Sequence, residues 1–158
     1  MTASLILAAL ALQSPEKLPP AGPIPAPQFE EAAVLAPIYE AFRAFEAQDS
    51  AAVLRLVYPD GRVTAVGTLA SGFSGVRRSS WAEWVARMKP GNGFKESITN
   101  PAVEIDGDVA LVWAPFTIEQ GGKVVACGYD HFDMVRQDGA WKVMNVTFSS
   151  RVTGCPGQ

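Results

Sequence analysis

Apolar side chains recur at steps of three and four residues over residues 28–48. This spacing predicts an amphipathic helix with one buried face. Pro37 should kink this helix or mark the point where it begins in earnest, because proline removes a backbone donor and clashes with the preceding turn. The predicted inward positions are Leu35, Ile38, Phe42 and Phe45.

Two shorter helices are expected further along the chain. Asp49 and Ser50 are candidate N-caps for a helix that runs through Val57. A brief helix is expected in the stretch SSWAEWVARM, where Ser79 or Ser80 supplies the cap and the two tryptophans belong to an apolar stripe. Such tryptophans more often pack in a core than bind a cofactor.

Strand-like patterns occupy most of the remaining sequence. Two of the connections between successive strands contain an Asp-Gly pair. Residues 106–107 and 138–139 are both Asp-Gly, the dipeptide that favours two-residue hairpin turns. Helices first and antiparallel strands last indicate an α+β fold, with N-terminal helices packed on a curved, mostly antiparallel sheet. The expected strands are residues 62–70, 94–105, 108–120, 123–136 and 140–152.

The last strands look apolar on both faces, so both faces should be buried. We expect helices on one face and a second subunit on the other, which predicts a homodimer through the outer sheet face. The outer face, where the second subunit is expected, is predicted to carry Phe132, Met134, Trp141 and Val143, and the other face Tyr129, Met144, Val146 and Phe148.

The N-terminal stretch differs from the rest of the chain. Residues 1–11 include an apolar run and a small-x-small site typical of signal-peptidase cleavage, although no basic residue precedes the run. A frayed apolar N-terminus or a misassigned start is the alternative. Residues 12–27 carry six prolines and should form an extended tether. We therefore expect a folded domain at 28–152, a tail at 153–158 and a periplasmic or secreted location.

Composition narrows the classes of partner. A chain of 158 residues with 48% apolar content can build one well-buried core. Its net charge of -3 includes no basic cluster of the kind that binds a phosphate backbone, so nucleic acid is not an expected partner. The N-terminal apolar run is too short to cross a bilayer, and no stable membrane insertion is expected. Cys127 and Cys155 could form one disulfide, which spacing alone does not decide.

The only histidine, His131, lies between two aspartates in the stretch GYDHFDMVRQDGAWKV. A two-residue turn at 138–139 would make Gln137 oppose Ala140. In that register Asp130 lies on one face of the sheet. Tyr129, His131 and Asp133 lie on the other face, together with their partners on the opposing strand. The predicted partners are Asp133 with Met144, His131 with Val146, and Tyr129 with Phe148.

Two segments together, AQDSAAVLRLVYPDGRV and VWAPFTIEQGGKVVACGYDHFDMVRQDGAWKV, resemble the nuclear transport factor 2-like superfamily. This cone-shaped fold is shared by ketosteroid isomerase, scytalone dehydratase, polyketide cyclases and many uncharacterised exported bacterial proteins. The resemblance covers most of residues 30–150. It matches Asp133 to the oxyanion-hole aspartic acid of the isomerases, and it implies a pocket lined by Phe116, Met144, Val146 and Phe148.

Other parts of the isomerase site do not match. The position of the general base is held by Val66, and the position of the oxyanion-hole tyrosine by Ala41 or Phe42. Valine cannot abstract a proton, so isomerisation by the ketosteroid route is disfavoured. A buried Asp133 would have a raised pKa and could donate a hydrogen bond to a carbonyl.

Three functions are consistent with these residues. We favour a domain that binds a small, mostly apolar molecule without turnover, with neither cofactor nor metal expected. A lyase, isomerase or cyclase that uses Asp133 and His131 is the alternative, and a dimeric protein-interaction module is the third. The predicted ligand-binding residues are Tyr129, His131, Asp133, Phe116, Met144, Val146 and Phe148.

Overall fold

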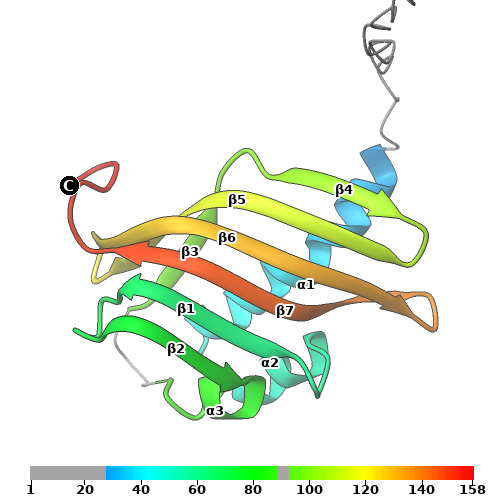
Figure 1. Ribbon diagram of the computed structural model, residues 1–158, viewed down its shortest axis with the longest axis horizontal. Helices are drawn as coiled ribbons and strands as arrows, with labels where there is room; N and C mark the ends of the chain where they lie inside the picture. The colour runs from blue at the N-terminus through cyan, green and yellow to red at the C-terminus, as the bar shows by residue number, and fades with distance from the viewer. Residues whose placement is uncertain (1–27, 89–92) are drawn as a thin grey trace, which may run out of the picture.

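The computed structural model describes residues 28–88 and 93–158 (Figure 1). The predicted signal peptide and proline-rich tether, residues 1–27, lie outside the described residues. Helices α1 and α2 pack along one face of a curved sheet, and α3 lies at its lower edge in Figure 1. The helices are α1 (Gln28–Glu46), α2 (Ser50–Leu56) and α3 (Trp81–Val85). The α+β fold class is confirmed.

Local sequence explains where the two short helices begin. The carboxylate of Asp49 accepts a hydrogen bond from the Ala52 N–H and caps α2, as predicted. At α3 the Ser80 hydroxyl accepts from the Glu83 N–H, while the Glu83 carboxylate accepts from the Ser80 N–H. This reciprocal capping box satisfies two donors that the first turn would otherwise leave unpaired.

The strands form a sheet in the order β2-β1-β7-β6-β5-β3, and β4 pairs with β5 on the same edge as β3. All described pairings are antiparallel except that of β1 with β7. The C-terminal strand therefore lies in the middle of the sheet (Figure 1). The strands are β1 (Arg62–Thr68), β2 (Ser74–Ser80), β3 (Lys95–Ile98), β4 (Ala102–Asp106), β5 (Val109–Gln120), β6 (Lys123–Gln137) and β7 (Ala140–Arg151).

Two details of the sheet differ from the sequence prediction. Residues 74–80 form strand β2, which is not among the strands expected from the sequence. The single strand expected at 94–105 is divided into β3 and β4, because Asn100 takes a left-handed conformation (φ 44°) before Pro101.

The β6–β7 hairpin has the predicted turn. Asp138 and Gly139 both have positive φ (53° and 79°), and Gln137 pairs with Ala140. The β4–β5 connection differs from the prediction by one residue, because Asp106 pairs with Val109 and the turn residues are therefore 107 and 108.

A β-bulge in β7 changes the predicted register. Met134 pairs with Val143, but Asp133 pairs with Asn145, so Met144 is an extra residue without a partner on β6. Beyond the bulge, His131 pairs with Thr147 and not with Val146, and Tyr129 pairs with Ser149 and not with Phe148. The predicted pairing of these residues, like that of Asp133 with Met144, is wrong.

Polar groups from three other elements hold the bulge. The Tyr58 N–H donates to the carbonyl of Val143 (2.8 Å), and the indole Nε1 of Trp81 donates to the carbonyl of Met144 (3.1 Å). Asn145 accepts from the Arg62 N–H (2.9 Å) and donates to Asp133 (3.1 Å). The polar groups that the bulge removes from regular β-sheet hydrogen bonding thus have other partners, as buried polar groups require.

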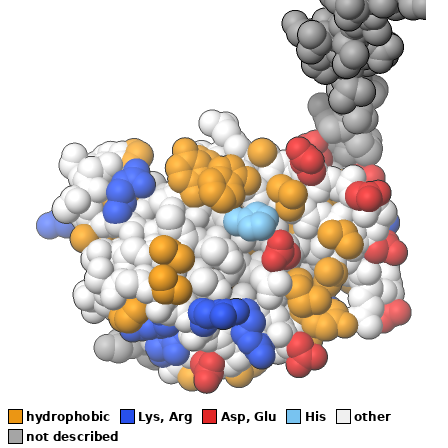
Figure 2. All heavy atoms as spheres, viewed as in Figure 1, with side chains coloured by type: hydrophobic (Ala, Val, Ile, Leu, Met, Phe, Trp, Pro, Cys, Tyr) orange, Lys and Arg blue, Asp and Glu red, His pale blue; other side chains and the backbone are white. Residues whose placement is uncertain are grey.

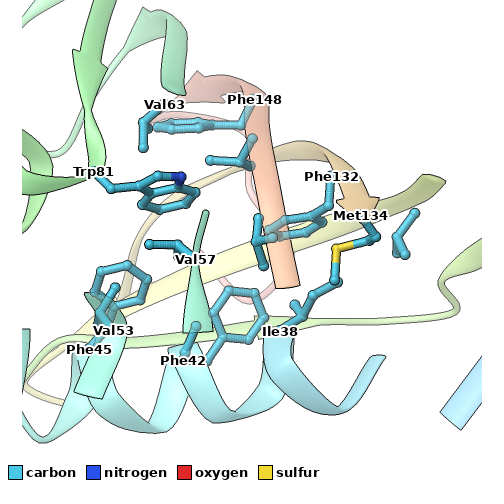
Figure 3. Packing of buried hydrophobic residues seen from close by; sticks show 14 of the residues in the cluster. Ile38, Phe42, Phe45, Val53, Val57, Val63, Trp81, Phe132, Met134 and Phe148 are labelled. Carbon is cyan, nitrogen blue, oxygen red and sulfur yellow. The ribbon is translucent and has the colours of Figure 1, made fainter. Parts of the chain in front are cut away.

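Because of the bulge, apolar residues from both halves of β7 lie on the same face of the sheet. Trp141 and Val143 precede it, Val146 and Phe148 follow it, and all are buried. They join Phe132 and Met134 of β6 in a core that packs against α1 (Figure 3). The face predicted to meet a second subunit, around Phe132 and Met134, is instead the face covered by helices.

The C-terminal tail is attached to the sheet. Cys127 of β6 and Cys155 form a disulfide with a Cα–Cα distance of 5.6 Å. Gln158 accepts a hydrogen bond from the Cys155 N–H, which further folds the tail back on itself. No helix within residues 28–88 and 93–158 combines the length and apolarity needed to span a bilayer.

Candidate functional site

A cavity of about 250 Å³ lies between α1, α3 and the helix-covered face of the sheet, which we call the inner face. Most of its wall is apolar. α1 contributes residues one and two turns apart and β6 contributes alternate residues, as the amphipathic patterns of the sequence require. β7 contributes residues from both sides of its bulge. Its apolar lining includes Ile38, Ala41, Phe42, Phe45, Val63, Trp81, Trp84, Met88, Ile118, Phe132, Val143, Val146 and Phe148.

Aromatic rings meet edge to face around the cavity. Trp84 and Phe148 have ring centroids 5.7 Å apart and an interplanar angle of 77°. Phe42 and Phe132 are 6.2 Å apart at 62°. This T-shaped geometry is the favourable one for aromatic pairs, and it fixes rings from α1, α3 and the sheet relative to one another. Flat apolar surfaces are therefore presented to any molecule in the cavity.

Asp130 is an acidic residue on this apolar wall. It projects from β6 onto the inner face, is 2% exposed, and its Oδ2 has no hydrogen-bond partner. Burial raises the pKa of the Asp130 carboxyl well above its ordinary value, and the nearby charge of Glu96 raises it further. Both effects favour the neutral, protonated form of Asp130.

Glu96 supplies a second carboxyl group to the cavity. It lies on β3, opposite Ile118 of β5, and also lines the wall. Burial raises the pKa of Glu96 to about 8. Two carboxyl groups that share one apolar cavity cannot both ionise easily, because each charge disfavours the other.

Gln48 adds an amide at the end of α1. Its backbone is left-handed (φ 58°), and its Nε2 donates to the carbonyl of Phe45 (2.8 Å). Its Oε1 is buried, lines the cavity with the rest of the residue, and has no partner. The amide is thus held by one end and offers an acceptor at the other.

Two arginines also line the cavity. Arg77 lies over the ring of Phe73, with its guanidinium carbon 3.9 Å from the centroid. Arg87, which is exposed, donates to the hydroxyl of Ser79 and lies over Trp84 at 5.4 Å. Because Arg87 reaches solvent, it marks the side on which the cavity opens.

The predicted row of Tyr129, His131 and Asp133 lies on the opposite, outer face of the sheet. Tyr129 is 42% exposed and stacks on Trp113, with ring centroids 5.3 Å apart. His131 Nε2 lies 3.6 Å from Asp133 Oδ1, and both side chains are more than one-third exposed. Figure 2 shows the histidine on the molecular surface beside a hydrophobic patch. These three residues do not line the cavity.

The other predicted residues are divided between the two faces. Val146 and Phe148 line the cavity, on the wall shared with Asp130. Phe116 is buried behind it and contacts Phe148 edge to face at 5.9 Å. Met144, the extra residue of the bulge, is half-buried and contributes its carbonyl to Trp81.

The positions that the resemblance matched to an isomerase site also separate. Val66, at the base position, is 40% exposed on β1, whereas Ala41 and Phe42 line the cavity from α1. Among the residues that the structure describes, no cluster of three or more histidine, cysteine or acidic side chains could hold a metal ion.

A family model described as "putative lumazine-binding" matches residues 29–149. The chain belongs to this family. The match covers α1 through most of β7, so every strand and helix that builds the cavity lies within the family domain. The sequence matches none of the curated proteins with which it was compared.

Solved structures share the fold of this family member. A protein of unknown function from Nostoc punctiforme, described as having a cystatin-like fold, aligns with a TM-score of 0.65 at 11% identity, covering 82% of this chain and 96% of that one. A nuclear transport factor 2-like protein from Novosphingobium aromaticivorans gives 0.62 at 14% identity, with 81% and 85% covered. The resemblance to the nuclear transport factor 2-like superfamily is confirmed.

A third solved structure, from the same Novosphingobium species, is described as a "putative aromatic ring hydroxylase". It aligns with a TM-score of 0.58 at 18% identity, covering 78% of this chain and 90% of that one. At such identities the likeness extends to the fold alone. The family match alone bears on the kind of domain, which is of a ligand-binding type.

Proposed function

We propose that the protein binds a small, mostly apolar ring molecule in the inner-face cavity and does not transform it. The supporting observation is the cavity itself, because an apolar enclosure with a few convergent polar groups is the usual form of a small-molecule site. Its volume of about 250 Å³ suits a molecule of one or two fused rings. Lumazine, the heterocycle in the family description, is of this kind.

Turnover by the predicted acid and base finds no support in the geometry. Asp133 and His131 lie on the outer face, so they do not converge on a substrate in the cavity. General acid–base catalysis needs both groups within hydrogen-bonding reach of the reacting atoms. Binding without turnover is the simpler use of this site.

Ligand screening by thermal shift tests the proposal. Naphthalene and lumazine should each raise the melting temperature in a concentration-dependent manner, because a ligand that binds only the folded state stabilises it. For Ala41→Met, at least ten times more ligand should be needed for the same rise in melting temperature, because the longer side chain would enter the cavity from α1. Ala51→Met, at an exposed position of α2, is the matched control and should leave binding unchanged. Failure of every aromatic ligand to stabilise the protein would refute the proposal.

We infer a homodimer through the outer face of the sheet. The supporting observation is the exposed stack of Trp113 on Tyr129, on a face that also exposes Leu111 and Val66. Exposed aromatic groups of this kind are enriched in protein interfaces. Light scattering should give twice the monomer mass for the wild type and the monomer mass for Trp113→Glu. Leu54→Glu, at an exposed position of α2, is the control and should remain dimeric. A monomeric wild type would reject the inference.

We also propose that the protein is exported. The disulfide between Cys127 and Cys155 supports this, because such bonds persist in oxidising compartments. The apolar run in residues 1–11 is consistent with a signal peptide. Mass spectrometry of the protein from periplasmic and culture fractions should find a mature N-terminus at Leu12. An intact N-terminus in the cytoplasmic fraction would contradict export.

A further inference from the structure

Two buried polar atoms without hydrogen-bond partners belong to residues that line the same cavity. They are Oδ2 of Asp130 and Oε1 of Gln48. Native proteins leave few buried polar atoms unpaired, because each one loses its hydrogen bonds to water and gains none in return. No other side-chain atom in the described residues has this status. Their occurrence in one cavity points to a ligand that supplies both partners.

The two groups need opposite hydrogen-bond partners: Gln48 needs a donor, and Asp130 needs an acceptor. The Gln48 amide already donates through Nε2 to the Phe45 carbonyl, so its free oxygen can only accept. Burial in this apolar wall and the charge of Glu96 raise the pKa of Asp130, so both favour its protonated form. A protonated carboxyl can donate to an acceptor on a ligand.

The cavity wall argues against a charged ligand. Arg77 and Arg87 would repel a cation, and an ion of either sign would lose its hydration against a wall that is mostly apolar. The apolar part of α1 that lines the cavity adds no further charge, since Ile38, Ala41, Phe42 and Phe45 are all uncharged.

We propose that Asp130 and Gln48 form a hydrogen-bonding subsite for a neutral, planar ring ligand that carries both an acceptor and a donor, as cyclic amides and imides do. This inference rests on the proposed function, because it assumes that the cavity is the binding site. It adds the chemical class of the ligand. The ring carbonyl would accept from Asp130, and the ring N–H would donate to Gln48.

Three probes of similar size separate this inference from apolar binding. Naphthalene offers neither hydrogen-bonding group, N-methylcarbostyril offers only the carbonyl acceptor, and carbostyril offers the carbonyl and an adjacent N–H. Ligand-observed NMR titration should rank their affinities in that order, each step being about fivefold to tenfold, which is the worth of one net hydrogen bond. Equal affinity for all three would overturn the subsite while leaving apolar binding in the cavity intact.

Variants assign each hydrogen bond. Gln48→Met should remove the preference for carbostyril over N-methylcarbostyril and leave naphthalene binding unchanged. Gln137→Met, which alters an exposed glutamine outside the cavity, is the matched control and should keep the preference. Asp130→Leu should lower the affinity for both carbonyl ligands toward that of naphthalene. Circular dichroism and unchanged naphthalene binding establish that each variant is folded.

The pH dependence of binding tests the role of Asp130 as donor. Only the protonated carboxyl donates, so carbostyril should bind with constant affinity at low pH and more weakly once rising pH ionises Asp130, whose pKa is raised by burial and by Glu96. Asp130→Asn keeps an N–H donor that does not titrate, and it should bind carbostyril with a weaker pH dependence. Tighter binding of naphthylmethylammonium than of carbostyril, increasing with pH, would overturn the inference in favour of a cation site.

Discussion

At the scale of single residues, Asp130 and Glu96 determine the electrostatics of the cavity. Both carboxyls lie in apolar surroundings, so both favour the neutral form. A carboxyl whose pKa is raised by folding binds more protons in the folded state than in the unfolded state. The free energy of unfolding must therefore fall as pH rises from the ordinary pKa of a carboxyl to the raised one.

Replacing Glu96 should make this pH dependence visible. The pKa of Glu96 rises from 4.5 to about 8, so its contribution is fully present below about pH 4 and is lost progressively up to about pH 8. Glu96→Gln should thus be more stable relative to wild type at pH 8 than at pH 5, by at most about 1.4 kcal/mol per pH unit. Urea denaturation at several pH values measures this, with Glu104→Gln on β4 as control. A parallel pH profile for wild type and Glu96→Gln would contradict the assignment.

Asp130 could have been found from the sequence, whereas the partnerless Gln48 oxygen could not. Asp130, Phe132 and Met134 alternate along β6 and must share a face. Once Phe132 and Met134 pack against the helices, Asp130 must lie on the helix-covered face with them. Gln48 follows the last residues of α1, where the pattern predicts only a helix end. Which end of its amide is paired depends on a turn conformation that no spacing reveals.

At the scale of elements, the bulge in β7 decides which residues face the cavity. Trp141 and Val143 lie at odd positions and Val146 and Phe148 at even ones, yet all four share the inner face. Such a change of phase within one apolar strand is itself a sequence signature of a bulge. Assuming a regular ladder through this point moved Tyr129, His131 and Asp133 to the wrong face, although the fold, the helices and the turn at 138–139 were predicted correctly.

Removing the side chain that holds the bulge should destabilise the protein. Asn145→Ala takes away the acceptor of the Arg62 N–H and the donor to Asp133. We expect a loss of about 1–2 kcal/mol in the free energy of unfolding, as for other hydrogen bonds that leave a partner unpaired. Thr147→Val, at an exposed position of the same strand, should change stability by less than about 0.5 kcal/mol. Equal stability of Asn145→Ala and wild type would show that the bulge needs no such support.

At the scale of the whole molecule, the disulfide joins the tail to the middle of the sheet. Cys127 lies on β6, and Cys155 is 28 residues further along, beyond the end of β7. The bond therefore closes a loop that contains the whole of β7. Cross-linking restricts the unfolded chain more than the folded one, and the effect grows slowly with loop length.

Reduction should lower the stability of the whole domain. For a separation of 28 residues the expected loss is about 3–4 kcal/mol. Urea denaturation with and without reductant measures it, and Cys155→Ser should show the reduced stability under both conditions. If the reductant destabilises Cys155→Ser as well, the loss has another cause.

The strand order has a consequence for the synthesis of the chain. β7 lies between β1 and β6, so the segment made last occupies the centre of the sheet. Until the ribosome has released residues 140–151, β1 and β2 have no contact with the β3–β6 part through the sheet, and the cavity lacks the wall supplied by Val143, Val146 and Phe148. Proteins usually begin to fold from the N-terminus during synthesis. This domain must wait for its C-terminal strand, and nascent chains that stop before Ala140 should be digested by protease as rapidly as an unfolded polypeptide.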